Sequence, residues 1–206
     1  MIYEDPINFV RLESDPTVLP EWPPSAHSHP LIMSAEELAG ILQGFQVREH
    51  RIGVQVMLAG EAPWEPAFSQ EEIALLAPRL SDALAHAKPD ERIAYYLSHP
   101  QTSIKREITS GGLYIQEQYL HFILGNRRII YGIPAYGMVY DRRYPMMPTA
   151  AKGFDLLFEP AEAVVKRESG VLDRMLGRAK DEVVIDLRKL HPGGPATHAI
   201  QGVPAS

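Results

Sequence analysis

Two stretches of the chain carry apolar residues at helical spacing, and each follows a capping sequence. The first begins at Ser34-Ala35-Glu36-Glu37 and ends at Gly44, and the second begins at Ser69-Gln70-Glu71-Glu72 and ends at Lys88-Pro89. In each case Ser and Glu three residues apart predict a capping box, and the apolar residues that follow form one stripe. Pro78 lies inside the second helix and removes a backbone donor, so it is expected to kink this helix or split it in two.

Strands are predicted where apolar and polar residues alternate. Residues 45–58 alternate in part, which predicts one bent strand or two, with a bulge at Gly53. A meander of antiparallel strands is predicted downstream, at residues 93–98, 104–108, 113–115 and 119–124. Ser110-Gly111-Gly112 is interpreted as its first turn and Glu117-Gln118 as its second, and the sheet is expected to have one polar and one apolar face.

After the meander, further strands are predicted at residues 154–158 and 183–187, with a short helix at 171–176 between them. Strands follow one another without a regular βαβ alternation, which argues against a doubly wound fold. The predicted fold class is therefore α+β: a single domain with a largely antiparallel sheet, the kinked helix packed on it, and a second, short helix nearer the N-terminus.

The predicted domain spans residues 34–190. Residues 1–33 are rich in proline and are interpreted as an extended leader, which either drapes over the domain or acts as a stiff tether. In the first case its apolar residues would be the anchors: Phe9, Val10, Leu19 and Trp22. Residues 191–206 are rich in Pro, Gly and Ala, and we predict that this tail is disordered.

The composition argues against several classes of function. None of the 206 residues is a cysteine, which removes disulfides, thiol catalysis and thiolate metal sites. The net charge of −6 disfavours generic nucleic-acid binding, and no apolar run is long enough to cross a membrane. The nucleophile-elbow, phosphate-loop, dinucleotide-binding and zinc-protease motifs are missing, so the sequence predicts no catalytic residue and no cofactor.

Residues 126–153, the basic segment, differ in charge from the rest of the chain. Four arginines and Lys152 against Asp141 give a net charge of 5 − 1 = +4, so the remainder carries −6 − 4 = −10. Tyrosines are interleaved with the arginines, and both residue types are enriched at interface hot spots. We therefore predict a contact surface formed by these residues: Arg127, Arg128, Tyr136, Tyr140, Arg142, Arg143 and Tyr144.

A second interpretation of the basic segment is ordinary sheet. Residues 127–131 and 137–141 would then be two further strands, with their arginines paired to acidic residues of the surface. The apolar residues of the segment would belong to the core: Ile129, Ile130, Ile133 and Val139.

Two alternatives assign a different function. A copper site would use His27 and His29, with Met146 and Met147 as soft ligands. Two histidines do not complete a site of three or four ligands, so the simpler interpretation is that both imidazoles are solvated in the leader. An enzyme or small-ligand binder would instead have its pocket between the kinked helix and the sheet.

Three stretches of the chain, residues 65–72, 89–93 and 120–124, together resemble a family of exported, lipid-anchored bacterial envelope proteins. That family has no assigned activity. The resemblance implies a periplasmic or outer-membrane-anchored protein whose signal peptide and lipid-bearing cysteine are missing from this sequence. A cytoplasmic protein is the alternative.

The leading interpretation is a non-enzymatic, soluble domain of a bacterial envelope protein. It would bind a protein or an envelope component through the basic segment, because the contrast in charge and the Arg/Tyr content both favour a contact surface there. The sequence specifies neither the partner nor the oligomeric state.

Overall fold

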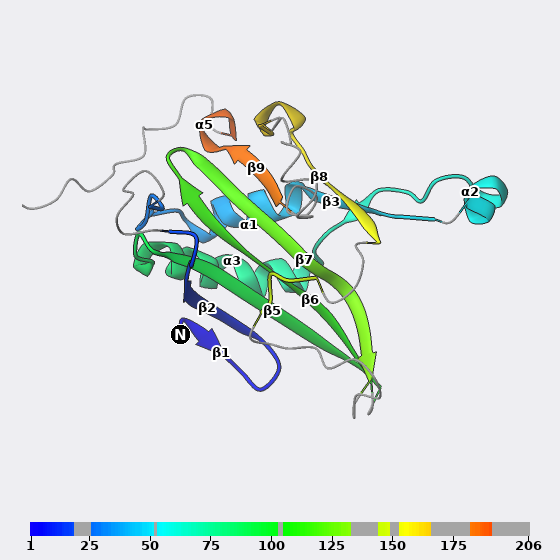
Figure 1. The fold of residues 1–206 in the computed structure, drawn as a ribbon, viewed down its shortest axis with the longest axis horizontal. Helices are drawn as coiled ribbons and strands as arrows, with labels where there is room; N and C mark the ends of the chain where they lie inside the picture. The colour runs from blue at the N-terminus through cyan, green and yellow to red at the C-terminus, as the bar shows by residue number, and fades with distance from the viewer. Residues whose placement is uncertain are drawn as a thin grey trace, which may run out of the picture.

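A six-stranded antiparallel sheet forms the centre of the fold and draws strands from both ends of the chain (Figure 1). The structure is a computed structural model that describes residues 1–18, 26–51, 53–102, 105–132, 144–148, 153–165 and 182–190. In spatial order the strands are β1 (Tyr3–Glu4), β2 (Phe9–Ser14), β5 (Glu91–Thr102), β6 (Lys105–Gln116), β7 (Tyr119–Gly132) and β9 (Glu182–Asp186). The predicted α+β class and the largely antiparallel sheet are confirmed.

A smaller, three-stranded sheet lies beside the first and has the order β4-β3-β8. Its strands are β3 (Phe45–Glu49), β4 (Glu65–Pro66) and β8 (Phe154–Phe158). The helices of the described residues are α1 (Ala35–Gly44), α2 (Gly53–Ala59), α3 (Gln70–His86), the 3-10 turn η2 (Ala161–Ala163) and α5 (Leu187–Leu190).

Helices α1 and α3 begin where their capping boxes predict. The Ser34 hydroxyl accepts a hydrogen bond from the Glu37 backbone N–H at 3.1 Å, and Ser69 caps Glu72 in the same way at 3.1 Å. α3 continues through Pro78 as one helix of 17 residues. Of the two outcomes expected at this proline, the split is therefore wrong.

The apolar stripes of α1 and α3 pack on one face of the large sheet (Figure 1). This contact is the centre of the main core, whose largest fully buried side chains are Tyr95, Phe45, Phe68, Phe122, Phe158, Leu38, Leu42, Leu76, Leu80, Leu84 and Ile93. Apolar side chains thus fill the space between α3 and the sheet, where the enzyme alternative expects a pocket.

The Gly111-Gly112 pair lies inside β6 and is not the predicted turn. A Cβ atom on Gly111 would lie 2.0 Å from the carbonyl oxygen of Ile123, and one on Gly112 would lie 2.6 Å from that of Ile93. These glycines are therefore needed for close approach of the neighbouring strands. The second predicted turn is confirmed, because the chain reverses at Glu117, whose φ is 55°.

The other face of the sheet is also covered over its middle, by residues 144–148, which cross in front of β6 in Figure 1. The Ser110 hydroxyl donates to the carbonyl oxygen of Pro145 at 2.7 Å, and the Asn126 amide donates to that of Met147 at 2.9 Å. Met146 lies against the backbone of Gly112. The expectation of one polar and one apolar face is wrong here, because the middle of β6 is buried on both sides.

Two further expectations differ from the structure, and a third agrees with it in part. Residues 45–58 form β3 followed by the helix α2, so the predicted second strand is wrong. The sheet begins with β1 and β2, which pair with each other and with β5, so the fold extends into the predicted leader (residues 1–33). Residues 127–131 continue β7, as the second interpretation of the basic segment expects, but its placement of Ile130 in the core is wrong, because this side chain is 59% exposed. The predicted elements at 137–141 and 171–176 and the tail at 191–206 lie outside the described residues.

Replacement of Gly111 by alanine tests the close strand approach. A Cβ atom there meets backbone, which no change of rotamer relieves, so Gly111→Ala should lower the free energy of unfolding by about 1–3 kcal/mol. Gly40 in α1 is the matched control, because a Cβ there meets nothing within 4 Å. Gly40→Ala should raise the free energy of unfolding by about 0.5–1 kcal/mol. Urea unfolding of both variants measures this, and equal effects would contradict it.

Candidate functional site

Of the seven residues predicted to form a contact surface, the structure describes three. Arg127 is buried, Arg128 is partly exposed, and Tyr144 has an exposed fraction of 56%. The other four lie outside the described residues: Tyr136, Tyr140, Arg142 and Arg143. The predicted surface is therefore placed only in part, and its binding role stays a prediction.

Arg127 faces the smaller sheet. Its side chain is 3% exposed and lies 3.7 Å from the carboxylate of Glu49 and 3.5 Å from that of Glu65. It also donates to the carbonyl oxygen of Pro66 at 3.3 Å. Burial, together with the charge of the neighbouring Arg128, lowers the pKa of the Arg127 guanidinium. In this arrangement Arg127 connects β7 to β3 and β4 and is not presented to a partner.

Residues 48–65, the arm, project from the part of the fold that the structure describes (Figure 1). The arm joins β3 to β4 and carries α2 well away from the two sheets (Figure 1). Val54, Met57 and Leu58 have exposed fractions of 67%, 87% and 81%. Their spacing of three and four residues places them on one side of α2. The arm therefore presents an apolar stripe to solvent.

The base of the arm is held by charged and aromatic contacts. The Arg48 guanidinium lies 4.7 Å from the ring centroid of Trp64 and forms ion pairs with Glu61 and Asp155. His50 lies 2.8 Å from the Asp155 carboxylate, and this hydrogen bond, followed by that from Arg48, holds the pKa of Asp155 below its ordinary value despite partial burial. The direction of the arm is thus set by side chains at its base.

The end of α2 is held by Arg51. Its guanidinium donates to the carbonyl oxygens of Ala59 and Gly60, both at 3.0 Å. These carbonyls belong to the last turn, where a helix has no internal donors for them. A seven-residue helix is marginal by itself, so this cation supports a helix that gains nothing from its exposed stripe.

A small hollow, open to solvent and with a cavity volume of about 80 Å³, lies at the base of the arm. Among the described residues that line the hollow, Arg127 is the one from the large sheet. The Nε of Arg127 has no hydrogen-bond partner among the described residues. The remaining lining comes from β3 and from the two ends of the arm: Val47, Glu49, Arg51, Ala62, Pro63 and Glu65.

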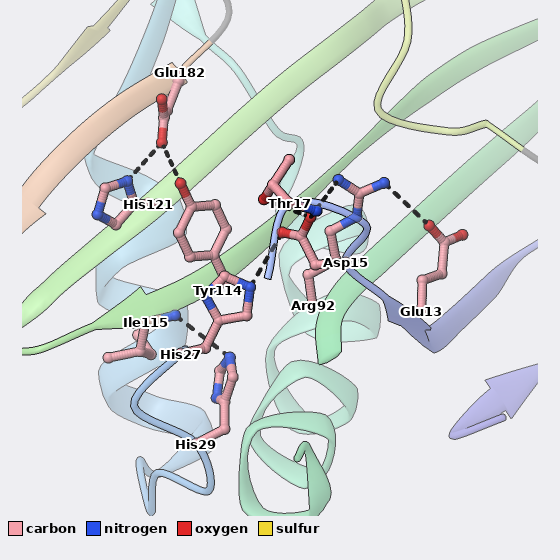
Figure 2. Close-up of polar contacts among 10 residues, drawn as sticks. All are labelled: Glu13, Asp15, Thr17, His27, His29, Arg92, Tyr114, Ile115, His121 and Glu182. Atoms are coloured by element: carbon pink, nitrogen blue, oxygen red, sulfur yellow. Dashed lines mark hydrogen bonds and ion pairs between the residues drawn. The ribbon is translucent and has the colours of Figure 1, made fainter. Parts of the chain in front are cut away.

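Two pairs of histidine and carboxylate form a second polar feature, the histidine–carboxylate cluster, on the large sheet (Figure 2). His121 of β7 lies 2.5 Å from the carboxylate of Glu182 in β9, and the Tyr114 hydroxyl of β6 donates to the same oxygen at 3.0 Å. The Tyr114 ring lies between the imidazoles of His121 and His27, with ring centroids 4.4 Å from each. Tyr114 thus connects the two pairs.

His27 pairs with Asp15 at 3.1 Å, and both side chains are 4% exposed (Figure 2). Burial alone would raise the pKa of the Asp15 carboxyl, but hydrogen bonds from His27 and Thr17 and the charge of Arg92 hold it well below its usual range. The backbone N–H of Ser28 adds a bond to the Ile115 carbonyl oxygen at 2.8 Å. The cluster therefore fastens the segment around residue 27 to β6.

His29 lies beside this pair and accepts a long hydrogen bond from the Ile115 backbone N–H at 3.4 Å. Burial, with repulsion from His27, lowers the pKa of His29 to about 4. The prediction that His27 and His29 are solvated is therefore wrong, since they are 7% and 6% exposed. The sequence analysis missed the histidine–carboxylate cluster, because its members are distant from one another in sequence. The one signal in the sequence is the pair of histidines, His27 and His29, in a proline-rich stretch.

The copper alternative finds limited support in this geometry. Among the described residues, no group of three or more His, Cys, Asp or Glu side chains is placed to hold a metal ion. Met146 packs against Gly112, and Met147 is 62% exposed. His27 is already paired with Asp15.

Comparisons with protein-family models, with curated proteins and with solved structures found no match. In the part of the chain that the structure describes, no helix has the length and apolar content needed to cross a membrane. The resemblance to lipid-anchored envelope proteins remains an expectation from the sequence.

The contrast between Arg127 and Arg128 is testable by their replacement with alanine. Arg127→Ala should lower the free energy of unfolding by about 1–3 kcal/mol, because it removes a buried side chain that joins the two sheets. Arg128→Ala removes the same charge from a partly exposed site and should change this free energy by less than about 0.5 kcal/mol. Urea unfolding of both variants gives the comparison, and similar values for the two would contradict the structural role of Arg127.

The buried His29 predicts a specific dependence of stability on pH. Its pKa of about 4 in the folded protein lies below the ordinary value of 6.5, so between these values the unfolded chain binds a proton that the folded protein does not. The contribution of neutral His29 to the free energy of unfolding is complete above pH 6.5. As the pH falls towards about 4, this free energy decreases by about 3 kcal/mol in total.

Replacement of His29 by glutamine isolates this contribution. The unfolding free energy of His29→Gln should fall less steeply than that of the parent between pH 6.5 and about 4. His86→Gln removes an imidazole whose side chain is 66% exposed and is the control for the loss of one histidine. Parallel curves for the parent and His29→Gln would contradict the burial of a neutral His29.

Proposed function

We propose that this chain is a non-enzymatic binding domain that docks on a partner protein through the arm. The observation that supports the proposal most is the exposure of Val54, Met57 and Leu58 on one stripe of a helix that projects from the fold. Single exposed apolar residues are common on protein surfaces, but a grouped stripe on a projecting element is typical of interaction sites. Anchors at i, i+3 and i+4 match the spacing with which a helix binds in an apolar groove of its partner.

The free energy gained by burying the three apolar side chains indicates how strong such a contact is. Complete burial of a Val, Leu or Met side chain contributes about 1.5–3 kcal/mol, so the three anchors together supply roughly 5 kcal/mol or somewhat more. Association costs about 4–15 kcal/mol in lost freedom of motion. The stripe alone therefore gives weak binding, and further contacts around the arm are needed for a specific complex.

The base of the arm suits this role because it is held from several directions. Arg48, His50 and Arg51 each contact groups outside their own part of the arm. An anchor that is already directed away from the body loses less conformational entropy on binding than one on a free loop. The remainder of the fold then acts as a scaffold.

The contact surface predicted on the basic segment remains a separate proposal. Tyr144 and Arg128 are accessible to a partner, while Arg127 is buried. A bacterial envelope protein remains the setting that the sequence resemblance implies. The proposed binding through α2 adds a second contact surface, on an element that the sequence analysis interpreted as strand.

Photocrosslinking from the arm tests the proposal. With benzoylphenylalanine in place of Met57, which is 87% exposed, native cells should yield one discrete adduct with another protein. The double variant Val54→Gln/Leu58→Gln should reduce this adduct at least about tenfold, because it removes two apolar anchors. Its unfolding free energy should change by less than about 0.5 kcal/mol, because both side chains are exposed.

The matched control places the same crosslinker at Ile32, which is 70% exposed but lies outside the arm. It should not produce the adduct. The proposal fails if no discrete adduct forms from position 57, if positions 32 and 57 give the same products, or if the double variant leaves the adduct unchanged.

A further inference from the structure

The cations and the carboxylates of the arm differ in their exposure to solvent. Its cations are buried or half-buried, whereas its carboxylates, although each forms an ion pair with Arg48 or Arg127, keep most of their side-chain surface in solvent. This arrangement has a consequence for the partner, because the charged surface that a partner meets beside α2 is mainly that of carboxylates.

The cations are used internally in three ways. Arg48 stacks on Trp64 and pairs with carboxylates at the arm's base, and its side chain is 28% exposed. Arg51 is directed at the carbonyl oxygens that end α2. Arg127, which approaches the arm from β7, is almost fully buried.

The carboxylates differ from these cations in exposure. The side chains of Glu49, Glu61 and Glu65 are 73%, 69% and 56% exposed. Glu61 follows α2 by two residues, and Glu49 precedes it by four, which is at most about 14 Å of extended chain. The apolar stripe is therefore accompanied by carboxylates on both sides along the arm.

We propose that the partner surface which receives α2 is an apolar groove bordered by lysine or arginine side chains. The inference rests on the proposed function and specifies the chemistry of the partner. The groove buries Val54, Met57 and Leu58, and its basic border faces Glu49, Glu61 and Glu65. Opposite charges at the rim of an interface mainly accelerate association, which helps a contact whose apolar area is small.

Charge also favours a partner with a basic-bordered groove over two alternatives, an anionic membrane and a second copy of this chain. An anionic bilayer carries the same sign as the three exposed carboxylates, so it does not complement them. A second copy of the chain carries a net charge of −6, and like charges oppose that encounter as well. A basic-bordered groove is the occupant whose charge complements the arm.

The test uses the protein captured by the crosslinker at position 57, purified and without the crosslink. Its association rate with the unmodified chain should fall at least about tenfold between about 50 mM and about 500 mM NaCl, because salt screens exposed charges. The triple variant Glu49→Gln/Glu61→Gln/Glu65→Gln should associate more slowly at low salt, with a much smaller dependence on salt. A control variant removes three exposed glutamates outside the arm, Glu36, Glu117 and Glu162, and should behave more nearly like the parent.

Several results would overturn the inference while leaving the proposed function intact. These are an association rate that does not change with salt, a triple variant that associates as fast as the parent, or equal effects of the two triple variants. Sedimentation with vesicles of phosphatidylcholine and phosphatidylglycerol would overturn it if the arm bound them and Val54→Gln/Leu58→Gln did not. Self-association of the purified chain that this double variant abolishes would also overturn it. Absence of any adduct from position 57 would instead remove the proposed function.

Discussion

The close approach of β5, β6 and β7 at Gly111 and Gly112 is the constraint on which the rest of the structure depends. Without side chains at these positions, the neighbouring backbones and Met146 come into contact with β6. The sheet is then packed by α1 and α3 on one face and by residues 144–148 on the other (Figure 1). This rigid body supports two surface features: the histidine–carboxylate cluster, which fastens an early segment to the sheet, and the arm, which leaves it.

Local signals in the sequence predicted α1 and α3 well, missed α2, and predicted the sheet in part. The capping boxes at Ser34 and Ser69 gave the correct starts, because their hydrogen bonds lie within four residues. The Gly111-Gly112 pair was misinterpreted as a turn, because local sequence does not distinguish a glycine that needs unusual dihedrals from one that needs space. The role of β2 in the sheet was missed because its partner, β5, is distant in the chain.

The candidate site was less predictable, for physical reasons that differ between residues. Val54, Met57 and Leu58 have helical spacing, but a short apolar run fits a strand as well as a helix, and the sequence does not show that their side chains are exposed. The basic character of Arg127 suggested a contact surface, yet its partners Glu49 and Glu65 come from another part of the chain and bury it. Exposure and pairing are properties of tertiary structure, and both decide whether a charged or apolar residue meets a partner.

The central claim is that the arm is a binding element separable from the fold that carries it. The register of β3 and β4 pairs Val47 with Glu65, and four further residues on each side would bring Arg51 opposite Glu61, so the shortened chain is designed with a two-residue Asn-Gly turn in place of residues 52–60. Calorimetric titration of this shortened chain with the protein crosslinked from position 57 is the most direct measurement. The account predicts no binding by a chain that still unfolds cooperatively. Binding with the affinity of the full chain would contradict it.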